Sequence, residues 1–250
     1  MTIQEITAGL PAPKPLRLAE TALFLDLDGT LAPIAARPQD VRPDPRRTSL
    51  LERLADRLDG RLAVISGRTL EDVDRILEGC VVAVAAVHGL VRREPDGRVS
   101  EARPHPGLTR AVEGLRAFAV RDSGLIVEEK GGLSVALHFR LAGRHAEAAR
   151  ACARELAAKN GLALQEGDMV EELRTPGANK GDSVRAFMAE PPFAGARPVF
   201  VGDDDTDEDG FEAAQRLDGL GVGVGAVRPT LARFRLAGVE AALAWLEAAQ

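Results

Sequence analysis

The chain has 250 residues, of which 45% are hydrophobic and 28% are charged, and its formal net charge is −6 at pH 7. This composition predicts a globular protein with a sizeable core, built as one large domain or two modest ones. The negative charge argues against a non-specific nucleic-acid binder, because such binding depends on clustered Lys and Arg, but it leaves a small anionic substrate open.

The first twenty residues carry three prolines, and we expect residues 1–20 to form a loose arm. They lack the basic start and apolar segment of a signal peptide, and no apolar run approaches the ~20 residues of a membrane span. Cys80 and Cys152 have no C-x-x-C partner, which indicates thiols in a reducing compartment. We therefore expect a cytoplasmic protein with no membrane partner.

Through the first hundred residues, apolar strands alternate with helical patterns. A buried strand runs into "FLDLDGTL" (24–31), and further strands are predicted over 61–67 and 81–89. Apolar residues at helical spacing predict helices over 48–60 and 69–79. Alternation of strands and helices is typical of parallel β-α-β units in an α/β sheet.

The middle of the chain has a different pattern, in which a helix is followed twice by two short strands. Those elements are predicted over residues 108–120, 124–130 and 133–140, and then over 144–161, 162–167 and 168–174. The alternating pattern resumes after residue 181. We therefore predict an α/β fold with a Rossmann-like parallel-sheet core (21–105 and 176–250) and an inserted α/β domain of two helix-hairpin units (106–175).

Four polar segments follow core strands or open core helices: Asp26 with Asp28, Ser66-Gly67-Arg68, Asn179-Lys180-Gly181, and "GDDDTDED" (202–209). Phosphoryl transfer through a protein nucleophile needs parts of these kinds. One carboxylate attacks phosphorus, and a second protonates the leaving alcohol and then activates water. Hydroxyl and ammonium groups hold the phosphate oxygens, and further carboxylates bind Mg²⁺. Singly, each segment also reads as an ordinary turn, loop or solvated helix start.

As a set, these segments resemble the four motifs of haloacid-dehalogenase (HAD) superfamily phosphatases. Longer strings resemble the trehalose-6-phosphate phosphatases, over roughly residues 20 to 247. Those strings are "VHG" (87–89), "VEEKGGLSVALHFR" (127–140), "VEELRTPGANKG" (170–181) and "VGDDDTDEDGF" (201–211). The chain departs from the family at Leu27, where a tyrosine is often found. The resemblance implies that the inserted segment is a mobile cap.

The resemblance also implies a role for each matching residue. Asp26 would be the nucleophile and Asp28 the general acid/base. Mg²⁺ would be held by residues Asp26, Asp28, Asp203, Asp204 and Asp207, with Asp28 acting through its backbone carbonyl. The phosphate would be bound by Ser66, Gly67 and Lys180, with Thr30 helping. Arg68 would orient the loop or contact substrate.

Sugar recognition must come from elsewhere, because these segments do not distinguish one phosphate ester from another. Strand alternation puts Glu128 with Lys130, and His138 with Arg140, on one face of a hairpin. That face suits a polyol, although a solvated face with surface ion pairs has the same composition. With the resemblance, we predict substrate contacts by Glu128, Lys130, Glu172, His138 and Arg140, and by His88, for which a structural role is an equal alternative.

The prediction is therefore a Mg²⁺-dependent phosphatase that converts trehalose 6-phosphate to trehalose and phosphate through an aspartyl-phosphate. A related sugar phosphatase, acting on sucrose 6-phosphate or a mannosyl-phosphoglycerate, is the nearest alternative. A non-catalytic sugar-phosphate sensor or a partner of the synthase is a second alternative. That alternative predicts damage to a catalytic segment, and all four segments are intact. A small-molecule substrate is expected, with no nucleic-acid partner.

Overall fold

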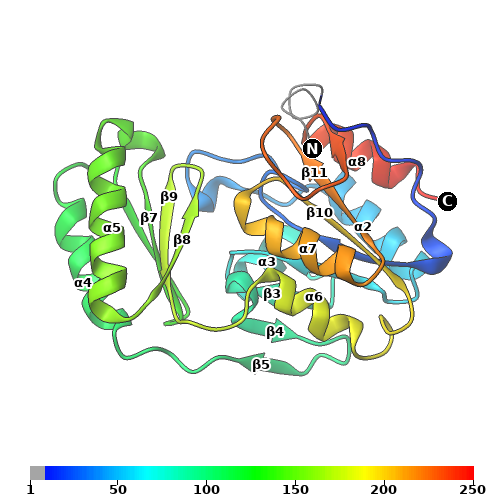
Figure 1. Cartoon of the computed structure of the whole chain (residues 1–250), viewed down its shortest axis with the longest axis horizontal. Coiled ribbons are helices and arrows are strands. Elements are labelled where there is room, and N and C mark those ends of the chain that lie inside the picture. Colours follow the sequence, from blue (N-terminus) through cyan, green and yellow to red (C-terminus); the bar gives the residue numbers. More distant parts are fainter. Residues whose placement is uncertain (1–8) are drawn as a thin grey trace. The chain divides into compact units, whose positions relative to one another are not determined.

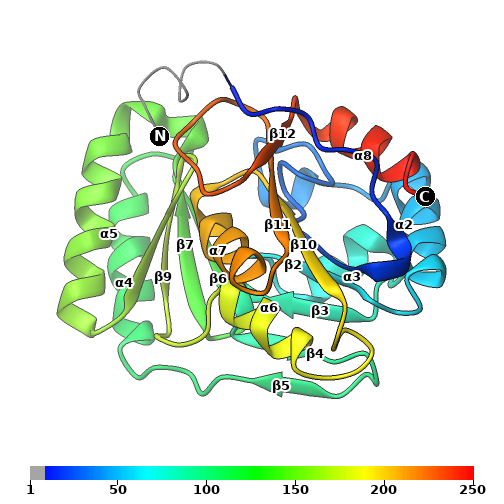
Figure 2. The same cartoon turned by 45° about the vertical axis from the view of Figure 1, so that its right-hand side comes forward.

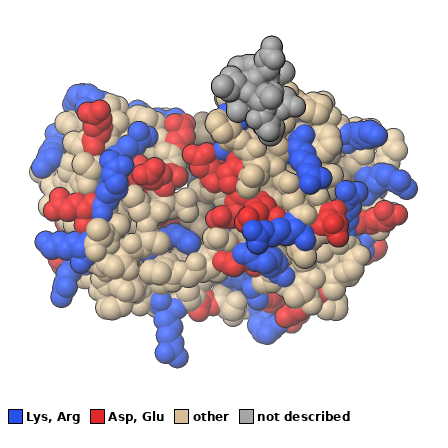
Figure 3. All heavy atoms as spheres, viewed as in Figure 1, with Lys and Arg blue, Asp and Glu red and all other residues tan. Residues whose placement is uncertain are grey.

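A computed structural model describes residues 9–250, which form two compact units (Figure 1). The first unit comprises the chain up to Ser100 together with Ala178–Gln250, and the second comprises Glu101–Gly177. Within the described residues, no helix is long and apolar enough to cross a membrane. Acidic and basic side chains are interspersed over the face drawn in Figure 3, with no extended region of one sign.

The first unit is built on an eight-stranded sheet. In spatial order its strands are β12 (Phe234–Leu236), β11 (Leu220–Val224), β10 (Arg197–Gly202), β1 (Thr21–Leu25), β2 (Leu62–Ile65), β3 (Ala83–Ala86), β4 (Val91–Arg93) and β5 (Val99–Glu101). Neighbouring strands from β12 to β3 are parallel, and β4 pairs antiparallel with β3. The predicted α/β fold with a parallel sheet is confirmed.

Helices cover both faces of this sheet (Figure 2). They are α2 (Pro45–Arg57), α3 (Leu70–Leu77), α6 (Lys180–Met188), α7 (Glu208–Arg216) and α8 (Val239–Glu247). Short 3-10 turns are η1 (Leu18–Glu20), η2 (Pro38–Asp40), η3 (Val87–Gly89) and η5 (Asp205–Asp207). Side chains of Asp44, Thr69 and Asn179 cap α2, α3 and α6 by accepting backbone N–H bonds that the helices cannot satisfy themselves.

The core under α6 and α7 is aromatic. The ring of Phe24 on β1 stacks on Phe193 at 5.4 Å between centroids and lies 6.2 Å from Phe187 of α6. Phe200 of β10 meets Phe211 of α7 edge to face at 5.6 Å. Burial of this apolar area holds both helices against the sheet, and with them the residues at their N-termini.

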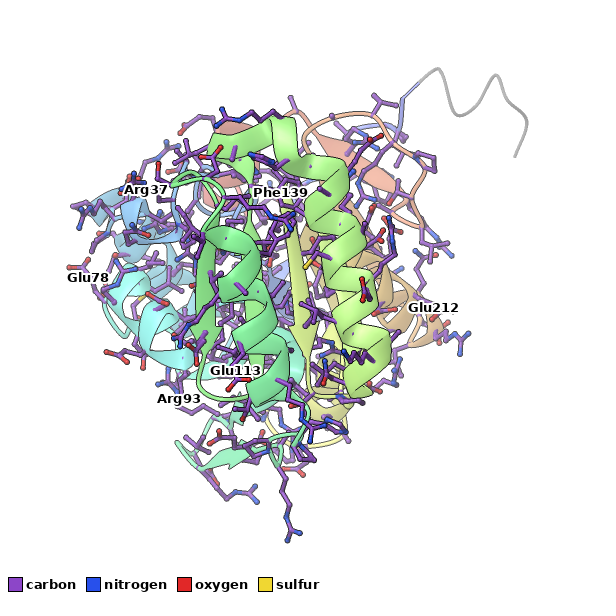
Figure 4. All side chains as sticks on the ribbon, turned by 90° about the vertical axis from the view of Figure 1, so that its left-hand side faces the viewer. Arg37, Glu78, Arg93, Glu113, Phe139 and Glu212 are labelled. Atoms are coloured by element: carbon purple, nitrogen blue, oxygen red, sulfur yellow. The ribbon has the colours of Figure 1, made fainter. Side chains whose placement is uncertain are left out.

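The second unit is a four-stranded antiparallel sheet with helices on one face. Its strands, in spatial order, are β6 (Ile126–Lys130), β7 (Ser134–His138), β9 (Val170–Arg174) and β8 (Ala163–Gly167). Helices α4 (Leu108–Ala119) and α5 (Ala146–Asn160) cover it, and η4 (Arg140–His145) precedes α5. As the alternation predicts, Val127, Val135, Leu137 and Phe139 pack with the helices. Figure 4 views this unit from the side of α4 and α5, with Phe139 labelled.

Two parts of the first unit differ from the prediction. Strands β4, β5 and β12 were not predicted, because each has three residues and too little apolar pattern to register. The loose arm is wrong for residues 9–20, while residues 1–8 lie outside the described chain. Leu16 and Leu18 are buried, and their backbones pair with Gln250. Apolar contact therefore outweighs the proline content there.

Candidate active site

Three of the four polar segments lie at one edge of the first unit's sheet. Asp26 and Asp28 follow β1, residues 66–68 follow β2, and Asp203 follows β10. Since β2, β1 and β10 are adjacent and parallel, their carboxyl ends meet at the edge where open α/β sheets bind ligands. Lys180, the first residue of α6, completes the set.

The Lys180 ammonium joins two carboxylates of this edge. Its Nζ lies 2.7 Å from Asp26 Oδ1 and 2.6 Å from Asp207 Oδ1, and the side chain is 3% exposed. Burial alone disfavours the ammonium, but the Asp207 and Asp26 carboxylates outweigh it and raise the pKa of Lys180. Gly181 allows α6 to approach α7, because a Cβ there would overlap the Asp209 carbonyl oxygen. The fold therefore holds a charged lysine against Asp26.

Asp207 organises the loop after β10. While Oδ1 accepts from Lys180, Oδ2 accepts from the backbone N–H groups of Asp203 at 2.9 Å and Asp204 at 3.0 Å. The Asp204 carboxylate caps the same turn by accepting from the N–H of Asp205 at 2.7 Å. Both oxygens of the fully buried Asp207 are thus engaged, so this residue positions the loop and Lys180.

Three carboxylates crowd together at this point. One ligand atom each from Asp26, Asp203 and Asp207 lie within 4.8 Å of one another. Burial, and then repulsion from Asp207, raises the pKa of Asp203 to about 7. Burial likewise raises the pKa of Asp26 well above its ordinary value, although Lys180 opposes the shift. Ionising these buried carboxyl groups together is therefore unfavourable, and Lys180 offsets that only in part.

This cluster fits a Mg²⁺ ion by its chemistry. All of its ligand atoms are hard carboxylate oxygens, and a divalent cation would offset both the burial and the mutual repulsion that raise these pKa values. The backbone also leaves room for the Asp203 carboxylate. Gly29 has φ +82°, and a Cβ there would overlap the Asp203 carboxylate. Among the described residues, the group of close carboxylates does not include Asp28 or Asp204.

The Asp28 carboxylate is held by Arg68. Nε of Arg68 lies 2.6 Å from Oδ2 and Nη2 lies 2.8 Å from Oδ1, a bidentate pair. The same guanidinium donates to the Pro38 carbonyl at 3.0 Å, and the Arg68 N–H donates to Ser66 Oγ at 3.2 Å. This pair joins the first segment to the second, while a loop-orienting or substrate-binding role for Arg68 stays a prediction.

Two further predicted residues lie beside these segments. The Thr30 hydroxyl donates to Asp203 Oδ1 at 3.2 Å, which links the first segment to the fourth. The His88 ring lies against Gly67, where a Cβ would overlap it, and the His88 N–H donates to the Ser66 carbonyl at 2.9 Å. His88 has φ 55° and is buried. The structure places His88 beside Gly67, while its contact with substrate stays a prediction.

The second unit brings together four of the predicted sugar contacts on the sheet face opposite α4 and α5. Lys130 Nζ of β6 lies 2.5 Å from Glu172 Oε2 of β9, reaching across the intervening strand β7. His138 Nε2 lies 2.8 Å from Glu128 Oε2. These contacts lower the pKa of Glu128 against the opposing effect of burial, which is the largest single influence. Glu128 is therefore favoured in its carboxylate form, and the contact with His138 orients its acceptor oxygen.

Arg140 lies apart from that group. It begins η4 beyond the end of β7, and its guanidinium donates to the carbonyl of Asp168 at 2.8 Å and to its carboxylate at 2.9 Å. The β7 alternation that would put Arg140 beside His138 stops one residue earlier, at Phe139, whose φ and ψ are not those of a strand.

Sequence reasoning also missed a residue of the first unit. Arg228, in the loop between β11 and β12, donates to the backbone carbonyls of Asp203 and Asp204. No periodic pattern marks such a contact. The one available signal is that β10 and β11 are parallel neighbours, so the loops after them share an edge.

Comparison with known proteins agrees with this arrangement. Residues 24–240 match the trehalose-phosphatase family model. A probable trehalose-phosphate phosphatase of Sinorhizobium fredii is 41% identical over 206 residues, covering 82% of this chain and 77% of that protein. The trehalose-6-phosphate phosphatase of Escherichia coli is 38% identical over 231 residues, covering 92% and 86%.

Solved structures show the same fold. A trehalose-6-phosphate phosphatase related protein superposes with a TM-score of 0.76 at 30% identity, covering 90% of this chain and 95% of that one. A HAD-superfamily phosphatase of Bacteroides thetaiotaomicron shares the fold with a TM-score of 0.59 at 18% identity, covering 94% and 95%. With its parallel α/β sheet and its clustered aspartates and lysine, the chain belongs to the trehalose-phosphatase family of phosphomonoester hydrolases.

Proposed function

We propose that this protein hydrolyses trehalose 6-phosphate to trehalose and phosphate, with Mg²⁺, through an aspartyl-phosphate on Asp26. The observation that carries the proposal is the contact of Lys180 with Asp26 beside the Asp203 carboxylate, in a chain of the trehalose-phosphatase family. A buried carboxylate beside a fixed ammonium suits attack on a phosphate, because the ammonium offsets the repulsion between two anions.

The reaction has two displacements at phosphorus. First, an Asp26 carboxylate oxygen forms a bond to phosphorus while the bond from phosphorus to the sugar O6 breaks, and Asp28 gives its proton to that oxygen. Then Asp28 takes a proton from water, whose oxygen attacks phosphorus and releases Asp26 and phosphate. Lys180 and Ser66 hold the non-bridging oxygens in both steps. Arg68 keeps the Asp28 carboxylate in place between the first step and the second.

The metal would be held by the Asp26 and Asp203 carboxylates with the Asp28 backbone carbonyl. When bound, Mg²⁺ neutralises charge on the phosphate and orients it for in-line displacement. Asp207 and Asp204 support that site by fixing the loop that carries Asp203.

Sugar recognition is assigned to the polar sheet face of the second unit, acting as a cap. Glu128, Lys130 and Glu172 offer carboxylate acceptors and ammonium donors that suit hydroxyl groups, and His138 orients Glu128. A buried site built to bond hydroxyls rejects ligands that lack them, because its polar groups are left unpaired. The second sugar ring should therefore matter for the rate.

A phosphate-release screen tests the proposal. Trehalose 6-phosphate should be hydrolysed with Mg²⁺ and not with EDTA, and glucose 6-phosphate should be poorer by ~10³ or more in kcat/KM. Preference for sucrose 6-phosphate or a mannosyl-phosphoglycerate would replace the substrate and keep the reaction. Full activity in EDTA would refute the metal-dependent mechanism.

Variants of the second unit test the recognition face. Glu128→Ala, Lys130→Ala and Glu172→Ala should erode the preference for trehalose 6-phosphate and leave p-nitrophenyl phosphate hydrolysis nearly unchanged. Glu129→Ala is the matched control, because Glu129 is on the same strand but faces the other side, where it pairs with Arg116. Equal losses on both substrates would assign these residues to the fold rather than to recognition.

A further inference from the structure

We propose that Arg228 is a positioning residue for the metal-binding loop, fixing the Asp203 and Asp204 peptides so that the Asp203 carboxylate faces the ion. The inference rests on the proposed function, since it takes Asp203 as a Mg²⁺ ligand. Arg228 lies outside the four polar segments and touches neither Asp26 nor Lys180 through any described hydrogen bond. Its effect on the reaction must therefore pass through the loop.

The guanidinium makes four contacts to one short segment. Nε lies 3.2 Å from the Asp203 carbonyl oxygen and Nη2 lies 2.6 Å from that of Asp204. Nη1 lies 2.7 Å from Asp205 Oδ1 and 2.9 Å from Glu208 Oε1. A planar fork with fixed donor directions can satisfy such a set, whereas a lysine ammonium is a single point of charge.

Together with Asp207, these contacts hold the loop at Asp203 and Asp204 from two sides. Asp207 Oδ2 accepts the N–H groups of Asp203 and Asp204, while Arg228 donates to the carbonyls of the same two residues. Each of the two residues is therefore held through both its N–H and its C=O. The Asp203 side chain has its own contact from the Thr30 hydroxyl. Removing Arg228 takes away the donor to the Asp203 carbonyl, while the Asp204 carbonyl keeps a bond from the Asp207 N–H at 3.0 Å. The N–H contacts of both residues with Asp207 stay in place.

Arg228 is itself anchored. Arg235 of β12 donates to the carbonyl oxygens of Gly225, Ala226 and Arg228, so the loop that carries Arg228 is tied to the sheet. The Arg228 side chain is 23% exposed, which keeps it short of the buried core. Because the loop that carries Arg228 is tied to the sheet and the guanidinium is planar and rigid, Arg228 can hold the metal-binding loop in a fixed position relative to the sheet edge.

Charge alone would act in the opposite direction. A guanidinium near the site repels a divalent cation, so removing it should tighten metal binding if electrostatics dominated. The loss of the carbonyl contacts should loosen binding, because residues that orient metal ligands typically contribute about 10–100-fold to affinity. Arg228→Lys retains the charge and removes the fork, which separates the two effects.

The test measures binding of Mn²⁺, an ion that also prefers oxygen ligands, from the EPR signal of the free ion in the absence of substrate. We expect Arg228→Ala to raise the Kd about 10-fold and Arg228→Lys to raise it about 3-fold. Arg216→Ala is the control, because Arg216 is an exposed arginine of α7 that pairs only with Glu212 among described ion pairs. Activity should recover at high Mg²⁺, with the activation constant raised and kcat nearly restored. Thermal unfolding in EDTA confirms that each variant is folded.

An unchanged or lowered Kd in Arg228→Ala would overturn the inference, as would a kcat that saturating Mg²⁺ does not restore. Asp203→Asn distinguishes this failure from failure of the proposed function. If Asp203→Asn weakens binding and Arg228→Ala does not, the metal site stands and the positioning role is wrong. If Asp203→Asn leaves binding unchanged, the proposed metal site is wrong and the inference falls with it.

Discussion

Replacing Asp207 by Asn tests how the active-site loop and Lys180 are held. The fully buried carboxylate accepts from Lys180 with one oxygen and from two backbone N–H groups with the other. An asparagine has a single oxygen. If that oxygen faces the N–H groups, its amide group points at the ammonium of Lys180. If it faces Lys180, the amide group points at two N–H groups, so each orientation places donor against donor.

The first orientation retains more contacts and removes one buried ion pair. Hydrogen bonds to charged groups contribute about 1.5–3 kcal/mol each, and breaking a buried pair costs about 3–5 kcal/mol. Lys180 keeps Asp26 as a partner, and the variant relieves repulsion among the three carboxylates. We therefore expect the free energy of unfolding to fall by about 2–3 kcal/mol, at the low end of the combined range. Because the loop and Lys180 would shift together, kcat/KM should fall about 10²-fold.

Urea unfolding in EDTA measures the stability change, and phosphate release with Mg²⁺ measures the activity. Glu212→Gln is the control, because Glu212 is an exposed acid of α7 paired with Arg216. An Asp207→Asn variant within about 0.5 kcal/mol of the parent stability, and within a factor of three in kcat/KM, would refute the reasoning.

Two further substitutions test packing and burial. Gly29→Ala, at φ +82°, should displace the Asp203 carboxylate and raise the Mg²⁺ needed for half-maximal activity; an unchanged requirement would mean that the close approach is unimportant. Glu171 is fully buried with Arg150 Nε 3.3 Å away, and burial, then Glu166, raises its pKa. The pKa of Glu171 is higher in the folded chain than in the unfolded chain. Ionisation of Glu171 therefore destabilises the fold as pH rises above about 4.5 and through the folded-state pKa, and it has no such effect below about pH 4.5. Glu171→Gln should therefore be more stable than the parent by about 1 kcal/mol in urea unfolding at pH 8 and nearly equal at pH 4.5; an equal difference at both would contradict the shift.

The parts of the fold that could be predicted from sequence are those with long apolar patterns. The strands before Asp26, Ser66 and Asp203 are buried runs, and parallel neighbours place their carboxyl ends together. The alternation in β6 and β7 likewise predicted which side chains face the helices. Periodicity carries this information because burial on one face or two is a property of each segment alone.

Contacts between loops could not be predicted in this way. The pairing of Asp28 with Arg68 and the contacts of Arg228 with the loop after β10 depend on how far side chains reach across strand ends, and no sequence period marks that. The prediction for the N-terminal residues was wrong for a related reason. Leu16 and Leu18 are too few to form a pattern, yet they find a buried place beside the C-terminus.

The most direct test of the account is to find where the phosphate is bound during turnover. The enzyme is mixed with trehalose 6-phosphate and Mg²⁺, quenched in acid within one turnover and reduced with borohydride, which converts a phosphorylated aspartate to homoserine. Peptide mass spectrometry should then find homoserine at position 26 and nowhere else. Unmodified Asp26 in enzyme that has released trehalose, or modification at Asp28 instead, would contradict the proposed mechanism.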